Sequence, residues 1–150
     1  MSEDDYSYEH LKKFKYIDCI QKETTRIYGP ANGLFLREPA EDLFLKDIPI
    51  KKGTLVSIRF TGSHYDEKYF KDPFKFQPER WENDPVLPPY VVGGFGGGAR
   101  TCIGKHLALL ESKIALIKFM KRYKKIVLPA EKIKMRIKLA YSPENFKVKL

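Results

Sequence analysis

The sequence predicts an α+β fold, in which two amphipathic helices flank a small antiparallel sheet and a glycine-rich loop. Three observations support this fold class. Apolar side chains recur every three or four residues in two separate segments, as they do on the buried face of a helix. Between these segments, short runs rich in Phe, Leu and Val are separated by Pro, Asp and Gly, as strands are by turns. Five of the six residues 93–98 are glycine, which disfavours regular structure because ordering glycine costs the most backbone entropy.

The first helix is expected over residues 11–28. Leu11, Phe14 and Ile17 begin the helical spacing of apolar residues, and Gly29, followed by a proline, is a typical helix end. This segment is therefore expected to present one apolar face to the rest of the fold.

Three short strands are expected next, over residues 34–36, 43–45 and 54–58, and they form the small antiparallel sheet. The stretch 63–81 mixes aromatic residues with charges and prolines, so we expect one short helix followed by an irregular meander. Because a meander has no regular hydrogen-bond ladder, its backbone has to be held by side chains.

The glycine-rich loop leads directly into the second helix. Apolar residues repeat there at four and three residues and form one stripe over residues 103–119. The remaining chain alternates apolar and basic residues over 133–139 and 146–150, with Ser-Pro-Glu-Asn at 142–145 between them. This pattern predicts a C-terminal β-hairpin whose turn is residues 142–145.

The chain of 150 residues, 43% of them hydrophobic, is long enough for one domain that buries roughly two-thirds of its unfolded surface.

The net formal charge of +9 is concentrated in residues 118–150, which hold eleven Lys or Arg against two Glu. Aromatic residues are not interleaved with these charges as in nucleic-acid modules, so we expect a solvated face or a surface for an acidic protein or an anionic membrane. No segment has the pattern of a signal peptide or a membrane span, which leaves the localisation open.

Cys102 ends the glycine-rich loop at the expected start of the helix, where free N–H groups and the helix dipole favour a thiolate. Arg100 adds a positive charge that stabilises a thiolate or binds a cofactor carboxylate. Other interpretations stay open on these residues alone. Cys102 is a buried small hydrophobe in one of them. In the others the loop binds phosphate: residues 94–99 match the loose dinucleotide pattern G-x-G-x-x-A, and residues 99–106 approach a P-loop but lack its first Gly and its Ser or Thr.

Residues 95–104, Phe-Gly-Gly-Gly-Ala-Arg-Thr-Cys-Ile-Gly, resemble the haem-loop signature of the cytochrome P450 family, F-x-x-G-x-R-x-C-x-G, at every specified position. In that family a cysteine thiolate binds the haem iron. The resemblance therefore implies a heme b cofactor with Cys102 as the axial metal ligand. It also implies that the loop binds this cofactor through Phe95, Gly98, Arg100, Cys102, Ile103 and Gly104.

Two further motifs support the resemblance. Glu23-Thr24-Thr25-Arg26 is similar to the family's E-x-x-R motif. Residues 76–81 are similar to its F-x-P-E-R-[FW] segment, and Arg80 matches the Arg of that segment. The resemblance implies that Glu23, Arg26 and Arg80 form a structural cluster that holds the meander, and with it the thiolate loop, in place. We expect these three side chains to be mutually paired and largely buried.

The sheet region resembles the stretch from which an Arg and a His reach the haem propionates, so Arg37 and His64 are expected to join Arg100 there. The departures from the family pattern lie away from the iron site, at Lys15, Thr25 and Lys51.

The implied fold is the C-terminal part of the cytochrome P450 fold, as one partial domain over residues 1–150. The implied enzyme is a haem-thiolate monooxygenase that oxidises an apolar small molecule with O2 and two electrons from a flavoprotein or iron–sulfur reductase. A face near Lys105, Lys113 and Lys118 is expected to dock that electron donor, and no nucleic-acid partner is expected.

The resemblance covers only the last part of a longer family. No segment resembles the central helix whose acid–threonine pair assists proton delivery to bound oxygen, so the isolated chain is not expected to hydroxylate a substrate. One alternative is therefore a truncated, non-catalytic fragment that keeps the haem motifs. A remote alternative is a nucleotide-binding domain that uses the glycine-rich loop.

Overall fold

The computed structural model describes residues 6–29, 31, 35–127, 134–137 and 140–144. It combines helices with small antiparallel sheets, which confirms the α+β class. The helices are α1 (Tyr8–Leu11), α2 (Lys15–Tyr28), α3 (Thr61–His64) and α4 (Lys105–Arg122), with 3-10 turns η1 (Pro78–Trp81) and η2 (Gly98–Arg100). The strands are β1 (Phe35–Arg37), β2 (Leu43–Leu45), β3 (Ile48–Ile50), β4 (Val56–Ile58), β5 (Met135–Ile137) and β6 (Tyr141–Pro143).

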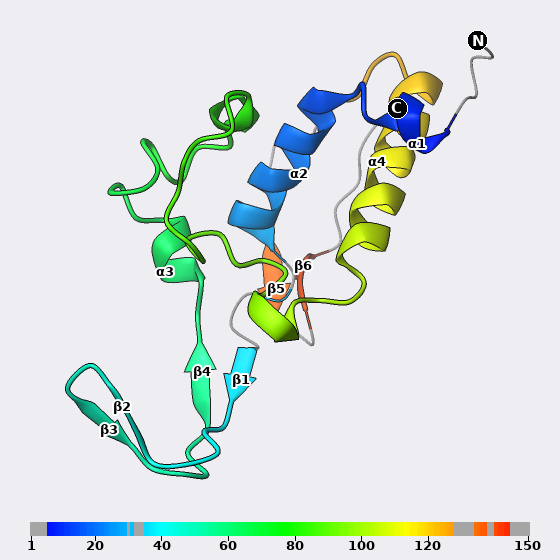
Figure 1. Cartoon of the computed structure of the whole chain (residues 1–150). Helices are drawn as coiled ribbons and strands as arrows, with labels where there is room; N and C mark the ends of the chain where they lie inside the picture. Colours follow the sequence, from blue (N-terminus) through cyan, green and yellow to red (C-terminus); the bar gives the residue numbers. More distant parts are fainter. Residues whose placement is uncertain (1–5, 30, 32–34, 128–133, 138–139, 145–150) are drawn as a thin grey trace.

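Helices α2 and α4 lie side by side, and the chain between them passes through β1 to β4 and α3 before it returns (Figure 1). The side chain of Gln21 joins the two helices. Its amide nitrogen lies 2.7 Å from the carbonyl oxygen of Leu109 and 2.6 Å from the hydroxyl of Ser112. This helix pair positions the two ends of the segment that carries the candidate site.

The helix predicted over residues 11–28 begins only at Lys15, as α2, and Leu11 ends the separate short helix α1. Phe14 separates them with a non-helical backbone of φ −87° and ψ 60°. Lys113 of α4 provides a physical reason, because its ammonium group donates to the carbonyl oxygen of Leu11 at 3.3 Å. The same ammonium group forms an ion pair with Asp18 at 2.5 Å, so it holds both sides of the break.

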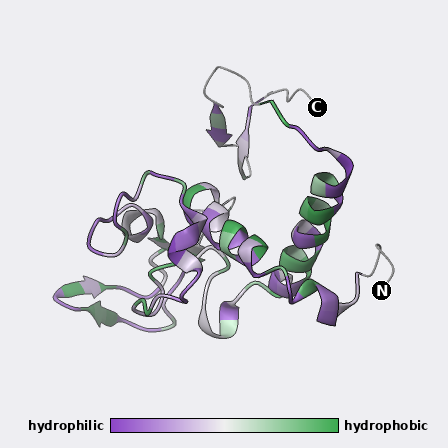
Figure 2. Cartoon of the chain, turned by 90° about the horizontal axis from the view of Figure 1, so that it is seen from above, coloured by the Kyte–Doolittle hydropathy of each residue, from purple (hydrophilic) through white to green (hydrophobic). Residues whose placement is uncertain are grey.

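The strands form separate two-stranded sheets where a single small sheet was expected. β1 pairs with β4, and β2 pairs with β3, both antiparallel. The second pair is a hairpin closed by residues 46–47, with Lys46 at a φ of 53° as tight hairpin turns require. This hairpin projects from the rest of the chain (Figure 1) and carries apolar residues on both strands (Figure 2).

The stretch predicted as a short helix and a meander has that organisation. α3 is followed by residues 65–77, which we call the meander, and then by η1. Phe70 of the meander and Trp81 of η1 pack with Cys19 of α2 and Val91 to form the buried core. The core therefore lies between α2, the meander and the start of the glycine-rich loop.

Helix α4 begins at Lys105, two residues later than the apolar stripe predicted. Only part of this stripe is buried in the described structure. Ile117 is buried, whereas Ile103 is fully exposed and Leu107 is 59% exposed. No helix in the described part of the chain has both the length and the hydropathy needed to cross a membrane.

The C-terminal hairpin is present with a different turn from the one predicted. β5 pairs with β6 so that Met135 lies opposite Pro143. Ser142 and Pro143 therefore belong to a strand, and the prediction of a turn at 142–145 was wrong. Pro143 lies in a two-stranded sheet, where each strand is an edge strand, and edge strands tolerate the missing N–H of proline. Residues 146–150, expected as the second strand, lie outside the described residues.

Candidate functional site

The backbone of Cys102 is fixed on both sides. Its N–H donates to the carbonyl oxygen of Phe95 at 2.9 Å, and its carbonyl oxygen accepts the N–H of Lys105 at 3.2 Å. Thr101 donates its N–H and its hydroxyl to the carbonyl oxygen of Gly98, at 3.1 and 2.9 Å. We call residues 93–104 the cysteine loop. It turns back on itself and holds the thiol of Cys102 exposed, just ahead of α4.

The cysteine loop also lies very close to α2. A Cβ atom added to Gly94 would lie 2.1 Å from the methyl carbon of Thr25, so the loop or the Thr25 side chain would have to shift. Gly94 is therefore required by the close approach of the loop to the helix that carries Glu23 and Arg26.

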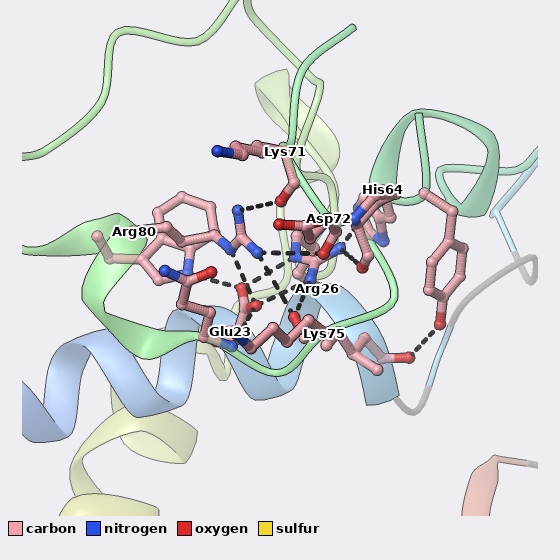
Figure 3. A network of polar contacts seen from close by, with 12 residues as sticks. Glu23, Arg26, His64, Lys71, Asp72, Lys75 and Arg80 are labelled. Carbon is pink, nitrogen blue, oxygen red and sulfur yellow. Dashed lines mark hydrogen bonds and ion pairs between the residues drawn. The ribbon is translucent and has the colours of Figure 1, made fainter. Parts of the chain in front are cut away.

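Glu23 is the centre of a buried polar cluster, which we call the Glu–Arg cluster (Figure 3). Arg26 donates to both of its carboxylate oxygens, at 2.8 and 2.9 Å, and Arg80 donates at 3.0 Å. The indole N–H of Trp81 and the backbone N–H of Gln77 donate at 2.9 and 3.0 Å. Burial alone would raise the pKa of Glu23, but these hydrogen bonds outweigh it and hold the pKa below its ordinary value.

The two arginines of the cluster donate hydrogen bonds to backbone carbonyl oxygens in and next to the meander. Arg26 donates to the carbonyl oxygens of His64, at 2.5 Å, and Pro73, at 2.7 Å. Arg80 donates to the carbonyl oxygen of Lys71 at 3.1 Å. The structure thus brings together Glu23, Arg26 and Arg80, and it shows the side-chain support that the irregular meander requires.

His64 differs in exposure from Arg37 and Arg100, the two arginines expected to contact the propionates with it. Arg37 on β1 and Arg100 in η2 are exposed, whereas the side chain of His64 is fully buried. Its ring nitrogen Nε2 accepts the N–H of Gly93 at 3.4 Å, and Nδ1 has no hydrogen-bond partner among the described residues. Burial lowers the pKa of His64, which favours the neutral ring. His64 thus differs from Arg37 and Arg100 in accessibility, and its contact with a propionate stays a prediction.

Lys113 also differs from the expectation. The predicted donor-docking face included it, but its side chain is buried between α2 and α4 with Asp18 and the carbonyl oxygen of Leu11. Lys118 is exposed, with its ammonium group 4.9 Å from the ring centre of Tyr6. The docking face therefore cannot include Lys113, because its charge is already neutralised inside the helix pair.

Sequence reasoning missed two contributors to the site. Trp81 binds the Glu23 carboxylate, a role that its place next to Arg80 in the F-x-P-E-R-[FW] segment could have suggested. The hydroxyl of Ser63 lies 2.8 Å from the carbonyl oxygen of Val91, two residues before the cysteine loop, and 2.9 Å from that of Phe60. A lone serine in a four-residue helix carries no sequence signal for such a contact.

The dinucleotide interpretation of the loop fails on structural grounds. It requires a strand ahead of the glycines, but residues 90–92 form a turn and a bend. The described sheets are two-stranded and antiparallel, whereas a dinucleotide fold is built on a parallel sheet.

The sequence is similar to those of known cytochromes P450. The chain is 41% identical over 117 residues to cytochrome P450 4V2 of Rattus norvegicus, which covers 77% of this chain and 22% of that protein. It is 34% identical over 146 residues to a putative cytochrome P450 120 of Synechocystis, covering 95% of this chain and 33% of the relative. The chain thus spans between about a fifth and a third of the length of these curated relatives.

Solved structures agree with the sequence relatives. A cyanobacterial cytochrome P450 with bound retinoic acid superimposes with a TM-score of 0.83 at 32% identity, over 92% of this chain and 32% of that one. A second cytochrome P450, CYP102L1, gives a TM-score of 0.86 at 25% identity, over 97% of this chain and 34% of that one. The family model for cytochrome P450 matches residues 2–150. The chain therefore belongs to the cytochrome P450 family.

Proposed function

We propose that Cys102 supplies the axial thiolate ligand of a heme b group that binds against the cysteine loop. The exposure of the Cys102 thiol on a fixed backbone carries this proposal, because an iron ligand has to be both accessible and held in place. Cys19, the other cysteine, is buried in the core, where burial raises the pKa of its thiol. The chemistry of the exposed groups near Cys102 fits the cofactor. Ile103 and Leu107 offer apolar surface to a flat macrocycle, and Arg100 is a cationic partner for a carboxylate.

The other cofactor contacts follow from the loop and the neighbouring strand. Phe95, Gly98, Ile103 and Gly104 surround Cys102 in the sequence of the loop, and Arg37 and Arg100 are assigned to the propionates. The Glu–Arg cluster keeps the loop in place from behind. A thiolate-ligated haem supplies oxygen activation, since the sulfur donates electron density that favours O–O cleavage.

We propose further that the protein acts as a monooxygenase on an apolar small molecule, with O2 and two electrons from a flavoprotein or iron–sulfur reductase. Two relatives support an apolar substrate by their names. One is an abietadienol/abietadienal oxidase of Pinus taeda, and one solved structure holds retinoic acid. Lys118 and its exposed basic neighbours at the end of α4 are assigned to donor docking, since Lys113 is buried.

The direct test is the absorption spectrum of the 150-residue chain after haem is added, reduced and exposed to carbon monoxide. A red-shifted Soret band is expected for the wild-type protein and for Cys19→Ala. Cys102→Ala is expected to lack it. Retention of the band in Cys102→Ala would show that another group binds the iron.

A second experiment separates the enzyme from a non-catalytic fragment. The haem-loaded chain is supplied with a reductase, NADPH and a set of lipophilic probes. Oxidation that Cys102→Ala abolishes and Cys19→Ala retains supports a complete catalytic site. A thiolate band without any oxidation supports the fragment that only binds haem.

A further inference from the structure

Helix α3 connects the Glu–Arg cluster to the start of the cysteine loop. On one side, Arg26 donates to the backbone carbonyl oxygen of His64 (Figure 3). On the other side, the Ser63 hydroxyl lies 2.8 Å from the carbonyl oxygen of Val91 and 2.9 Å from that of Phe60, and His64 accepts the N–H of Gly93. Ser63 and His64 thus contact the backbone at Gly93, where the loop begins, and at Val91, two residues before it, while the cluster binds the carbonyl oxygen of His64.

A short series of backbone hydrogen bonds continues from this point to the candidate ligand. The carbonyl oxygen of Gly93 accepts the N–H of Gly96 at 2.8 Å, and that of Phe95 accepts the N–H of Cys102 at 2.9 Å. A change in the position of Gly93 therefore alters the turn that holds Cys102.

The ring of His64 accepts the Gly93 N–H, but this leaves its other nitrogen without a hydrogen-bond partner among the described residues. Because Nε2 accepts the Gly93 N–H, the ring proton is assigned to Nδ1, a buried donor with no partner among the described residues. A buried donor without a partner destabilises a fold, so such a group calls for an explanation beyond packing. The ring of Phe60 stacks on the ring of His64, with 6.5 Å between the ring centres. A Cβ added to Gly93 would lie 2.3 Å from a carbon of the Phe60 ring, so the loop has little room to move at Gly93.

We propose that His64 and Ser63 are positioning residues for Cys102, which fix the start of the cysteine loop to the buried Glu–Arg cluster through α3. This inference rests on the proposed function for its consequence at the iron, but the clamp itself is a property of the apoprotein. The neutral form of His64 is required, because a protonated ring would present an N–H to the Gly93 N–H. Burial lowers the pKa of His64 and so supports that form.

The test uses the full 150-residue chain with four substitutions. His64→Leu keeps an apolar side chain of similar bulk without an acceptor, and His64→Gln restores an acceptor near the position of Nε2. Ser63→Ala removes the hydroxyl that contacts the carbonyl oxygens of Val91 and Phe60. Tyr65→Phe is the matched control, since it neighbours His64 and its hydroxyl binds the carbonyl oxygen of Ile27, outside the cysteine loop, at 2.8 Å.

Hydrogen exchange of the apoprotein measures the clamp without any cofactor. In His64→Leu the Gly93 amide is expected to exchange about threefold to tenfold faster than in the wild-type protein, the range that one net hydrogen bond implies. Amides inside α4 should be unchanged, and Tyr65→Phe should leave Gly93 protected. If His64→Leu does not fold, Ser63→Ala and His64→Gln decide, with a smaller rise for the first and protection close to wild type for the second.

The haem-loaded proteins give the second readout. His64→Leu is expected to shift the reduced carbon monoxide spectrum from the thiolate band towards that of a neutral thiol, and His64→Gln to restore it. Unchanged Gly93 exchange in both His64→Leu and Ser63→Ala, or an equal effect of Tyr65→Phe, overturns the proposal. Faster Gly93 exchange together with a wild-type protein that shows no thiolate band would establish the clamp and refute the proposed function.

Discussion

Replacing Glu23 with Gln removes the negative charge that Arg26 and Arg80 share in the buried cluster. The carboxylate accepts from Arg26, Arg80, Gln77 and Trp81, so an amide NH2 group at either oxygen position would face at least two of these donors. Breaking a buried ion pair by removing one partner costs about 3–5 kcal/mol. Domains of this size are stable by only about 5–15 kcal/mol, so the loss is a large fraction of the total.

Urea unfolding followed by far-ultraviolet circular dichroism measures this loss. With a slope of about 2 kcal/mol/M, a loss of about 4 kcal/mol lowers the unfolding midpoint by roughly 2 M. Glu79→Gln is the matched control, because Glu79 is exposed and binds the hydroxyl of Tyr16 at 2.6 Å outside the cluster. A Glu23→Gln midpoint no lower than that of the control would refute the assignment of the cluster as the support of the meander.

Three further outcomes are expected. The pKa values of Glu23 and His64 both lie below their ordinary values in the folded chain, so the unfolded chain binds more protons on acidification. Stability should accordingly fall from about pH 6.5 downwards as His64 begins to charge in the unfolded state, and again through the acid range of Glu23, as urea midpoints across pH would show. Gly94→Ala should destabilise the chain by about 1–3 kcal/mol, since its Cβ would overlap the Thr25 methyl group, and Thr25→Ser in the same chain should restore most of the midpoint. Lys113→Met should cost about 1–2 kcal/mol in urea unfolding by removing the ion pair between α2 and α4, whereas substitution of an exposed lysine of α4 should be nearly neutral.

Local sequence patterns were sufficient for the parts of the fold that depend on local chemistry. The i,i+3 spacing of Glu23 and Arg26 on α2 and the glycine-rich loop before Cys102 identified both halves of the candidate site. The helix break at Phe14 was not foreseeable in this way, because it coincides with a contact from Lys113, a residue about one hundred positions later. Helical spacing reports a continuous apolar face and carries no information about such distant partners.

The burial of His64 and the turn of the C-terminal hairpin could not be read from local sequence for a similar reason. Sequence resemblance assigned His64 to a cofactor contact, but burial decides whether an imidazole is accessible, and burial depends on how α3 packs against the loop. Ser142 and Pro143 are common in turns, yet the register with β5 places them in a strand. Pairing between strands overrode local turn preference there.

The way in which the arginines hold the meander has a consequence for how this segment tolerates change. Arg26 and Arg80 bind main-chain carbonyl oxygens, which every amino acid possesses, at Lys71, Pro73 and Lys75. The exposed side chains of Lys71 and Lys75 take no part in these contacts, so saturation mutagenesis should accept most residues at both positions. These hydrogen bonds therefore do not depend on which amino acids occupy the meander. Its exposed side chains can vary while its backbone conformation is retained.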